Sequence, residues 1–160
     1  MMDWKNNYYQ LTGSKRALKL TQLTGGVVIL PRFNNQFLLL EHLRVDGQVH
    51  YEVPRGFTEL NEKFTLAAHR ELNEELNLRP TKLTFLGEVM PDSGLIESHI
   101  RCYLADLGSL KGLVVQRSEQ ITGYQLFSLS ELLMLVRNNQ IIDGFTLSTV
   151  LKYLAIKDED

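Results

Sequence analysis

Several features are scarce in this sequence, and each shortage excludes a class of protein. The one cysteine, Cys102, permits no internal disulfide and no metal site built from several thiolates. The net charge of −2 lacks the basic excess with which proteins usually hold nucleic acid, so we expect no nucleic acid duplex as a partner. No apolar run is long enough to span a bilayer, and residues 1–10 lack the basic and apolar regions of a signal peptide. We therefore expect no membrane contact and a cytoplasmic location.

The residues that are present are typical of one globular unit. A length of 160 residues suits one domain with one core, so we expect a single domain over residues 1–160. Hydrophobic residues make up 44% and charged residues 22%, proportions that exclude a disordered or collagen-like chain. The last four residues, 157–160, form a charged tail that we expect to fray.

Strand patterns occupy much of the chain. Residues 8–23 are typical of two short strands around a turn at 12–15, which makes 1–23 a hairpin-like N-terminal segment. Six further runs have the β-branched and apolar character of strands, at 27–31, 36–42, 49–53, 82–90, 98–105 and 121–129. We expect these strands to form one mixed sheet with helices packed on it, which is an α/β fold.

Three helices are predicted between and after these strands. The first occupies residues 64–77, with Thr65 as its N-cap and Asn77 in the left-handed conformation that ends a helix. The second begins at Ser130, a good N-cap residue, and the third spans roughly residues 146–156.

The first helix carries a concentration of carboxylates. At about 100° per residue, Glu71 and Glu75 stack one turn apart, with Glu74 beside them. Glu62 adds a fourth carboxylate if the preceding loop folds back. Hard oxygen ligands gathered in this way suit Mg²⁺ or Mn²⁺. Taken alone, however, the Glu74–Glu75 pair favours a solvated helix face, with Arg70 paired to Glu74 at i, i+4.

The longer pattern around these glutamates reverses that judgement, because residues 56–78 resemble the Nudix box. The matching positions are Gly56, Glu62, Arg70, Glu71, Leu72, Glu74, Glu75 and Leu78. The family's final glycine is Asn77 here, and asparagine is the next best residue for a left-handed backbone. The resemblance implies a Nudix-type α/β/α sandwich with a mixed β-sheet.

The resemblance also implies roles for single residues. Metal ions in the family are held by the glutamates that correspond to Glu71 and Glu75, often assisted by Glu74. The main-chain carbonyl before the box glycine, which is that of Arg55 here, commonly binds metal as well. The box arginine, Arg70 in this chain, orients the glutamates through a salt bridge.

The remaining box positions imply support for this arrangement. Gly56 begins the box, and Glu62 supports the helix or the metal shell through water. The implied cofactor is Mg²⁺, with Mn²⁺ as an alternative. The implied reaction is attack of water on one phosphorus of a diphosphate, with the metal lowering the pKa of that water.

Two segments beside the box are similar to those of ADP-ribose pyrophosphatases. Residues 40–44 and 51–57 match a strand that ends in an arginine and a segment with aromatic, Glu, Pro and Gly positions. Arg44 is then a candidate ligand for substrate phosphate, although a solvated loop arginine explains it equally well. Residues 87–97 resemble the strand and loop after the box helix, where Glu97 either faces the site or serves as a turn residue.

A third segment resembles the loop that delivers a late catalytic or metal-binding glutamate, for which Glu119 is the candidate. The subfamily often carries a second acid two residues earlier, where this chain has Arg117. That departure leaves the general base open between Glu119, Glu97 and a box glutamate. Arg117 is a candidate for substrate phosphate, since the arginine fork suits phosphate oxygens.

The N-terminal segment is shorter than the N-terminal domain of ADP-ribose pyrophosphatases, which helps to build a dimer and an adenine pocket. A homodimer is therefore one possibility for this chain. Its aromatic residues Trp4, Tyr8 and Tyr9 either stack on a base or form core contacts, and core contacts are the default. The histidines His42, His50, His69 and His99 show no ligand spacing and are interpreted as structural or surface residues.

The hypothesis that follows is a hydrolase for the diphosphate linkage of a small nucleotide, with ADP-ribose or a similar nucleotide sugar preferred. Hydrolysis of dinucleoside polyphosphates or NADH is the first alternative, and hydrolysis of a nucleoside triphosphate is the second. A binding module that senses a nucleotide without cleaving it is a different class. The intact box glutamates argue against such a sensor.

Overall fold

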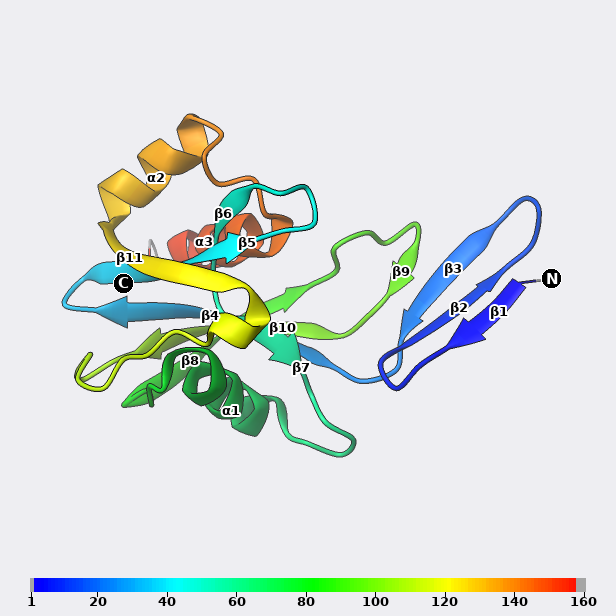
Figure 1. Cartoon of the computed structure of the whole chain (residues 1–160), viewed down its shortest axis with the longest axis horizontal. Helices are drawn as coiled ribbons and strands as arrows, with labels where there is room; N and C mark the ends of the chain where they lie inside the picture. Colours follow the sequence, from blue (N-terminus) through cyan, green and yellow to red (C-terminus); the bar gives the residue numbers. More distant parts are fainter. Residues whose placement is uncertain (1, 158–160) are drawn as a thin grey trace.

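The computed structural model of the chain describes residues 2–157, which fold as a mixed sheet between helices together with a separate N-terminal sheet (Figure 1). The strands are β1 (Met2–Lys5), β2 (Tyr9–Gly13), β3 (Leu18–Gln22), β4 (Gly26–Phe33), β5 (Gln36–Leu43), β6 (Val49–Glu52), β7 (Arg55–Phe57), β8 (Lys82–Val89), β9 (Ile96–Glu97), β10 (Ile100–Asp106) and β11 (Ile121–Ser128). The helices are α1 (Phe64–Leu76), α2 (Leu129–Arg137), α3 (Gly144–Lys157) and the 3₁₀ turn η1 (Arg117–Glu119). The expected tail at 158–160 lies outside the described residues.

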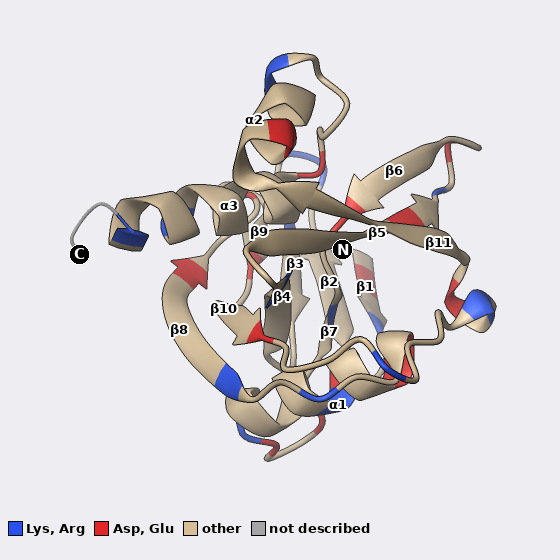
Figure 2. Cartoon of the chain, turned by 90° about the vertical axis from the view of Figure 1, so that its left-hand side faces the viewer, with Lys and Arg blue, Asp and Glu red and all other residues tan. Residues whose placement is uncertain are grey.

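The apolar run of β4 is buried on both of its faces, which explains why it lacks polar alternation. Val27 and Ile29 belong to the core cluster under α1, whereas Val28 and Leu30 belong to the cluster under α2 and α3. Side chains alternate along a strand, so one continuous apolar run fills both cores. Both views place α1 on one face of the sheet and α2 and α3 on the other (Figures 1 and 2). The predicted α/β fold with a mixed sheet is therefore confirmed.

The main sheet has the strand order β11-β5-β4-β10-β8, and it splits in its middle. Strands β4 and β5 pair only near their shared turn, at Arg32↔Phe37 and Phe33↔Gln36. Beyond that point β7 pairs with β4 and β6 pairs with β5. The short segment Arg55–Phe57 therefore enters the sheet beside β4 and lies against α1.

The N-terminal strands correct the expectation of one sheet. Strands β1, β2 and β3 form their own sheet with β9, in the order β1-β2-β3-β9, and this sheet projects to one side of the body (Figure 1). The predicted hairpin at 8–23 is confirmed by β2 and β3. Strands β1 and β9 were not predicted, because they are short and β9 is held by parallel pairing with β3, a contact 76 residues apart at Leu20↔Ile96.

Two predicted helix caps are wrong. The helix α1 begins at Phe64 after Lys63, which makes no side-chain cap, so Thr65 lies inside the helix. The N-cap of α2 is Ser128 and not Ser130: the Ser128 hydroxyl accepts from the backbone N–H of Glu131, whose side chain bonds back to Ser128. Sequence alone could not distinguish two serines two residues apart.

Among residues 2–157, no helix is both long and apolar enough to cross a membrane.

The left-handed end of α1 is confirmed at Asn77, whose φ is 54°. Its side-chain amide also donates to the carbonyl of Gly112 at 2.9 Å, an interaction that glycine cannot make. We expect Asn77→Gly to change the free energy of unfolding by less than about 0.5 kcal/mol. Glycine adopts the left-handed backbone conformation more readily than asparagine, and this gain offsets the lost hydrogen bond. Asn77→Ala should lose both advantages and destabilise by about 1–2 kcal/mol. Urea denaturation of the two variants measures the difference, and equal losses would contradict this account.

Candidate active site

Two glutamates of α1, Glu71 and Glu75, are buried where the helix packs on the sheet. Ala68, Leu72 and Leu76 pack into the core cluster beneath the main sheet. Because Glu71 and Glu75 directly precede two of these apolar residues, they lie about 100° from them and share the shielded side of the helix. The exposed fractions are 7% for Glu71 and 2% for Glu75. The interpretation of a solvated Glu74–Glu75 face is thus wrong for Glu75, whereas Glu74 is exposed and pairs with Arg70 as that interpretation expected.

Arg70 gathers the acidic side chains and the preceding loop. Its guanidinium donates to Glu71 at 2.7 Å and to Glu74 at 3.0 Å. It also bonds both carboxylate oxygens of Glu62, at 3.0 and 2.9 Å, and the carbonyl of Phe57 at 2.7 Å. The hydrogen bond to Glu62 is the main reason that the pKa of Arg70 is raised. Arg70 therefore fixes the loop and the helix relative to each other while neutralising part of the acidic charge.

Among the buried carboxylates of residues 2–157, Glu52 and Glu71 are paired with arginine and Glu75 forms no ion pair. Its Oε1 accepts a long bond of 3.4 Å from the backbone N–H of Arg55, and its buried Oε2 has no hydrogen-bond partner among residues 2–157. Burial, followed by the like charges of Glu119 and Glu71, raises the pKa of Glu75 to about 9. A buried carboxylate with one free oxygen is unfavourable by itself. A cation beside that oxygen would remove the penalty.

Gly56 allows the sheet to approach α1 closely. It lies in β7, opposite Val27 of β4, and a Cβ added to it would overlap the carboxyl carbon and both oxygens of Glu71. Glycine is required here because the backbone and a carboxylate occupy the space of a side chain. The close contact also explains why burial raises the pKa of Glu71 despite its bond to Arg70.

A cavity of about 350 Å³ collects most of the predicted site residues. It is lined by Tyr8, Arg55, Gly56, Phe57, Thr58, Glu59, Arg70, Glu71, Glu74 and Glu119. Glu119 reaches this cavity from η1, far from the box in sequence, where Gln120 ends the turn in the left-handed conformation at φ 64°. Figure 2 shows the red segments of acidic residues on the ribbon of α1. The structure thus brings the box and the late glutamate together.

His42 holds the loop that carries Glu119. Its Nε2 donates to the carbonyl of Glu119 at 2.8 Å, and its Nδ1 lies 4.0 Å from Glu52. The histidine is 8% exposed, and burial, with the nearby charge of Arg44, lowers its pKa. The sequence analysis gave His42 no link to the site, because only the pairing of β5 with β11 places it opposite Ile121.

A buried ion network supports the other side of Gly56. Glu52, 3% exposed, accepts hydrogen bonds from Arg44 and forms an ion pair with Arg55, whose nitrogen lies 2.9 Å from its Oε2. Arg55 also donates to Asp143 at 2.7 Å and lies over the ring of Phe145, 4.9 Å from its centroid. The charges of Arg44 and Arg55 are therefore largely compensated within the protein. This network holds the main chain at Arg55 in place.

Three predicted substrate residues do not line the carboxylate cavity. Arg44 is bound to Glu52. Glu97 pairs with Lys19 at 2.6 Å on the N-terminal sheet and lines a different cavity. Arg117 is exposed at the start of η1. Their roles toward substrate stay predictions.

The carboxylates fit a divalent cation in chemistry and charge, although they are not arranged as a finished coordination shell. Among residues 2–157, no three His, Cys, Asp or Glu side chains form a ready-made metal site. Arg70 binds one oxygen of Glu71, while the free oxygen of Glu75 points to no partner. Hard oxygen donors with excess negative charge suit Mg²⁺ or Mn²⁺ once these side chains adjust.

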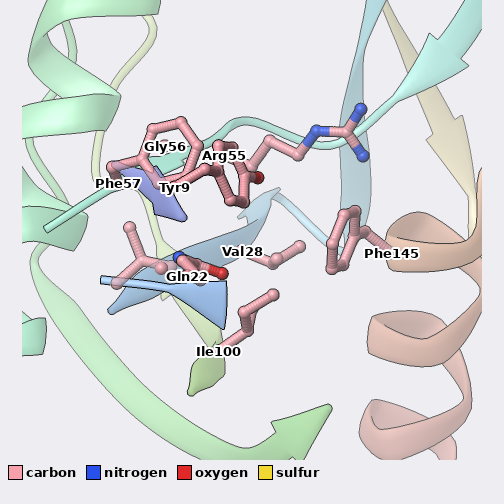
Figure 3. Close-up of a pocket in the computed structure, with 10 residues that line it drawn as sticks. Tyr9, Gln22, Val28, Arg55, Gly56, Phe57, Ile100 and Phe145 are labelled. Atoms are coloured by element: carbon pink, nitrogen blue, oxygen red, sulfur yellow. The ribbon is translucent and has the colours of Figure 1, made fainter. Parts of the chain in front are cut away.

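A second cavity, of about 270 Å³, adjoins the first (Figure 3). The two cavities share Arg55, Gly56 and Phe57. The other walls of the second cavity come from β2, β3, the start of β4, the start of β10 and α3. The shared residues join a carboxylate-rich cavity to an aromatic one.

A mixed sheet between helices, with buried glutamates of α1 facing the glycine of β7, is the arrangement expected of a Nudix-type pyrophosphohydrolase. The chain belongs to the Nudix family, because the NUDIX domain model matches residues 22–146. The suspected family resemblance is thereby confirmed. No curated protein matches the sequence.

The fold is also similar to solved structures. One of them, described as the crystal structure of an ADP compounds hydrolase, superposes with a TM-score of 0.74 at 16% sequence identity. The match covers 98% of this chain and 90% of that chain, so it extends over the N-terminal sheet as well as the main sheet. At this identity the likeness establishes the fold.

Proposed function

We propose that this Nudix hydrolase cleaves the diphosphate linkage of a nucleoside diphosphate derivative, with ADP-ribose or a similar nucleotide sugar as the preferred substrate. The observation that carries the proposal is the unpartnered oxygen of Glu75, buried beside Glu71 and electrostatically coupled to Glu119. Three carboxylates that share only the cation of Arg70, which is itself bound to Glu62 and Glu74 as well, are unfavourable in the free protein. They become favourable when a divalent cation and a substrate phosphate bind beside them, in the cavity that Glu71 and Glu119 line.

The cofactor we propose is Mg²⁺, with Mn²⁺ as the alternative. Its ligands would come from Glu71 and Glu75, assisted by Glu74 and Glu119, and from the carbonyl of Arg55. A bound divalent cation lowers the pKa of the attacking water and neutralises charge on the departing phosphate. The fit of the carboxylates to a hard cation supports this assignment.

The protein's own groups have separate tasks in this proposal. Glu119 is the preferred general base, because it lines the same cavity as Glu71. It is held on the 3₁₀ turn η1, and no arginine is bound to its carboxylate among residues 2–157. Arg70 positions the glutamates and does not contact substrate. Arg44 and Arg117 are proposed to bind substrate phosphate, Arg44 through the part of its fork not engaged by Glu52.

Two observations support a nucleoside diphosphate derivative as substrate. The carboxylate cavity is joined to an aromatic cavity through Arg55, Gly56 and Phe57, so a diphosphate and a ring system can be bound side by side. The structural neighbour that covers 98% of this chain is described as an ADP compounds hydrolase. Both favour a substrate with an adenosine diphosphate portion.

Phosphate release from a panel of substrates tests the proposal. The panel contains ADP-ribose, NADH, a diadenosine polyphosphate, a GDP-sugar and a nucleoside triphosphate, each with Mg²⁺ and a coupled phosphatase. We expect ADP-ribose to be preferred and to give AMP and ribose 5-phosphate. If no substrate in the panel releases phosphate with either Mg²⁺ or Mn²⁺, the proposed reaction is overturned.

The contact between His42 and the Glu119 loop gives a prediction for turnover. We expect His42→Leu to lower kcat by about tenfold with a smaller change in KM, because a displaced base loses alignment with its water. His42→Gln keeps a donor and should retain most of the activity. Steady-state kinetics measure both variants, and His50→Gln is the control, since His50 bonds Asp46 in an exposed turn. Equal activity of the Leu and Gln variants would contradict a positioning role.

A further inference from the structure

The loop that carries Glu119 is attached to the end of the carboxylate helix. It spans residues 107–120, between β10 and β11, and its one regular element is the turn η1. The backbone N–H groups of Val114 and Gln116 donate to the carbonyls of Leu76 and Glu75, at 3.0 and 2.9 Å. The last carbonyls of a helix have no partner within the helix, so they accept from donors that the rest of the fold supplies. The last turn of α1 therefore holds the middle of this loop.

A third hydrogen bond in the same attachment comes from a side chain. The amide of Asn77 donates to the carbonyl of Gly112 at 2.9 Å. The three bonds therefore fall at every second residue of the loop, at Gly112, Val114 and Gln116. The side chains between them, Leu113 and Val115, pack against the core cluster under α1. Both the backbone and the apolar side chains of residues 112–116 are thus held against the helix.

This attachment extends to the proposed base. The backbone N–H of Glu119 donates to the carbonyl of Gln116 at 3.2 Å. Two successive backbone hydrogen bonds, from Gln116 to Glu75 and from Glu119 to Gln116, therefore connect the two residues. Since a base must be aligned closely with the water it activates, the position of Glu119 depends on how firmly the loop is attached to α1.

Asn77 stands where the family pattern has glycine. Glycine also adopts the left-handed conformation, but it has no side chain with which to bind the loop. We infer that Asn77 is a positioning residue for the reaction, because its amide anchors the loop 107–120 on α1 and so holds Glu119 beside Glu71 and Glu75. This inference rests on the proposed function for the role of Glu119.

Hydrogen exchange of the metal-free protein tests the anchor without any turnover. Asn77→Gly keeps the left-handed end of α1 and removes only the side-chain amide. We expect the protected amides of Val114 and Gln116 to exchange about fivefold faster, the scale of one lost hydrogen bond. Mass spectrometry follows the peptide that spans residues 107–120. The peptide of α2 in the same sample reports any loss of overall stability and should exchange at the wild-type rate.

A second left-handed asparagine provides the matched control. Asn139 follows α2 with φ 55° and is exposed. Asn139→Gly makes the same substitution at another helix end, so the loop 107–120 should exchange at the wild-type rate in this variant. If the loop also exchanges at the wild-type rate in Asn77→Gly, the anchor is overturned.

Steady-state kinetics with Mg²⁺ and the preferred nucleotide test the consequence for Glu119. We expect Asn77→Gly to lower kcat by about fourfold with a smaller change in KM, because a less ordered base affects the chemical step more than substrate binding. Asn139→Gly should keep both constants. A loop that exchanges faster in Asn77→Gly while kcat stays at the wild-type value would overturn the positioning role.

The two measurements also separate this inference from the proposed reaction. Faster loop exchange in Asn77→Gly, in a protein that hydrolyses nothing in the substrate panel, would support the anchor and sink the reaction. Hydrolysis of ADP-ribose by a protein whose loop is indifferent to Asn77→Gly would do the opposite.

Discussion

Replacement of Glu75 by glutamine is expected to abolish hydrolysis and, at the same time, to stabilise the metal-free protein. The side chain is nearly isosteric, so the fold should remain, but the proposed cation loses an anionic ligand. We expect kcat/KM to fall by about three orders of magnitude, the scale of several kcal/mol of lost charge stabilisation. Turnover of the preferred nucleotide with saturating Mg²⁺ measures the effect.

The stability gain follows from the raised pKa of Glu75. Because the folded protein holds the proton up to a pKa of about 9, against an ordinary 4.5, the folded state binds protons more strongly than the unfolded state. The free energy of unfolding of the wild-type protein therefore falls as pH rises from about 4.5 to about 9. Glu75→Gln removes this loss, and at pH 7 it should be more stable than the wild type by about 1–3 kcal/mol.

Metal titration joins the two effects. Mg²⁺ should raise the Tm of the wild-type protein and leave that of Glu75→Gln nearly unchanged, since only the former has the full ligand set. Glu59→Gln is the matched control, because it removes the same charge from an exposed residue on the rim of the cavity. A Glu75→Gln protein that retains both turnover and the Mg²⁺-dependent rise in Tm would refute the metal assignment.

Addition of one methyl group at Gly56 should be almost as damaging to activity. In Gly56→Ala the new Cβ occupies the position of the Glu71 carboxylate, which must move away from Arg70 and from the cavity. We expect a loss of activity of about a hundredfold and a destabilisation of about 1–3 kcal/mol, typical of an overpacked interior. Steady-state kinetics and urea denaturation measure the two losses.

A matched glycine controls for the general effect of alanine. Gly144 begins α3, and nothing lies within 4 Å of a Cβ added there. Gly144→Ala should therefore leave activity unchanged and keep stability within about 0.5 kcal/mol, since alanine is favourable in a helix. If Gly56→Ala behaves like Gly144→Ala, the close approach of the strand to Glu71 has no functional importance.

Local features of the fold were predictable where residues close together in the sequence determine the structure. The turn at Asn77 and the buried strand β4 were predicted, because a left-handed residue and a continuous apolar run are each determined by neighbouring residues. The separate sheet of β1, β2, β3 and β9 was not predicted. Its two outer strands are two and four residues long, and they exist through pairing with distant partners.

The same distinction applies to the site. The spacing of Glu71 and Glu75 could be read from one helix, but their burial could not, because it depends on the approach of Gly56 from another strand. Glu119 was predicted from a resemblance, whereas the support of its loop by His42 appears only when β5 pairs with β11.

The sequence by itself determined the family, the α/β character of the chain and which helix face carries the carboxylates, since these depend on residue types at fixed local spacing. The tertiary structure decided which carboxylate is left without compensation and which cavity adjoins it. The physical reason is that desolvation and hydrogen-bond partners are set by groups from distant parts of the chain. Glu75 is one polar residue among many in the sequence, and only the fold buries it and leaves its Oε2 without a hydrogen-bond partner among residues 2–157.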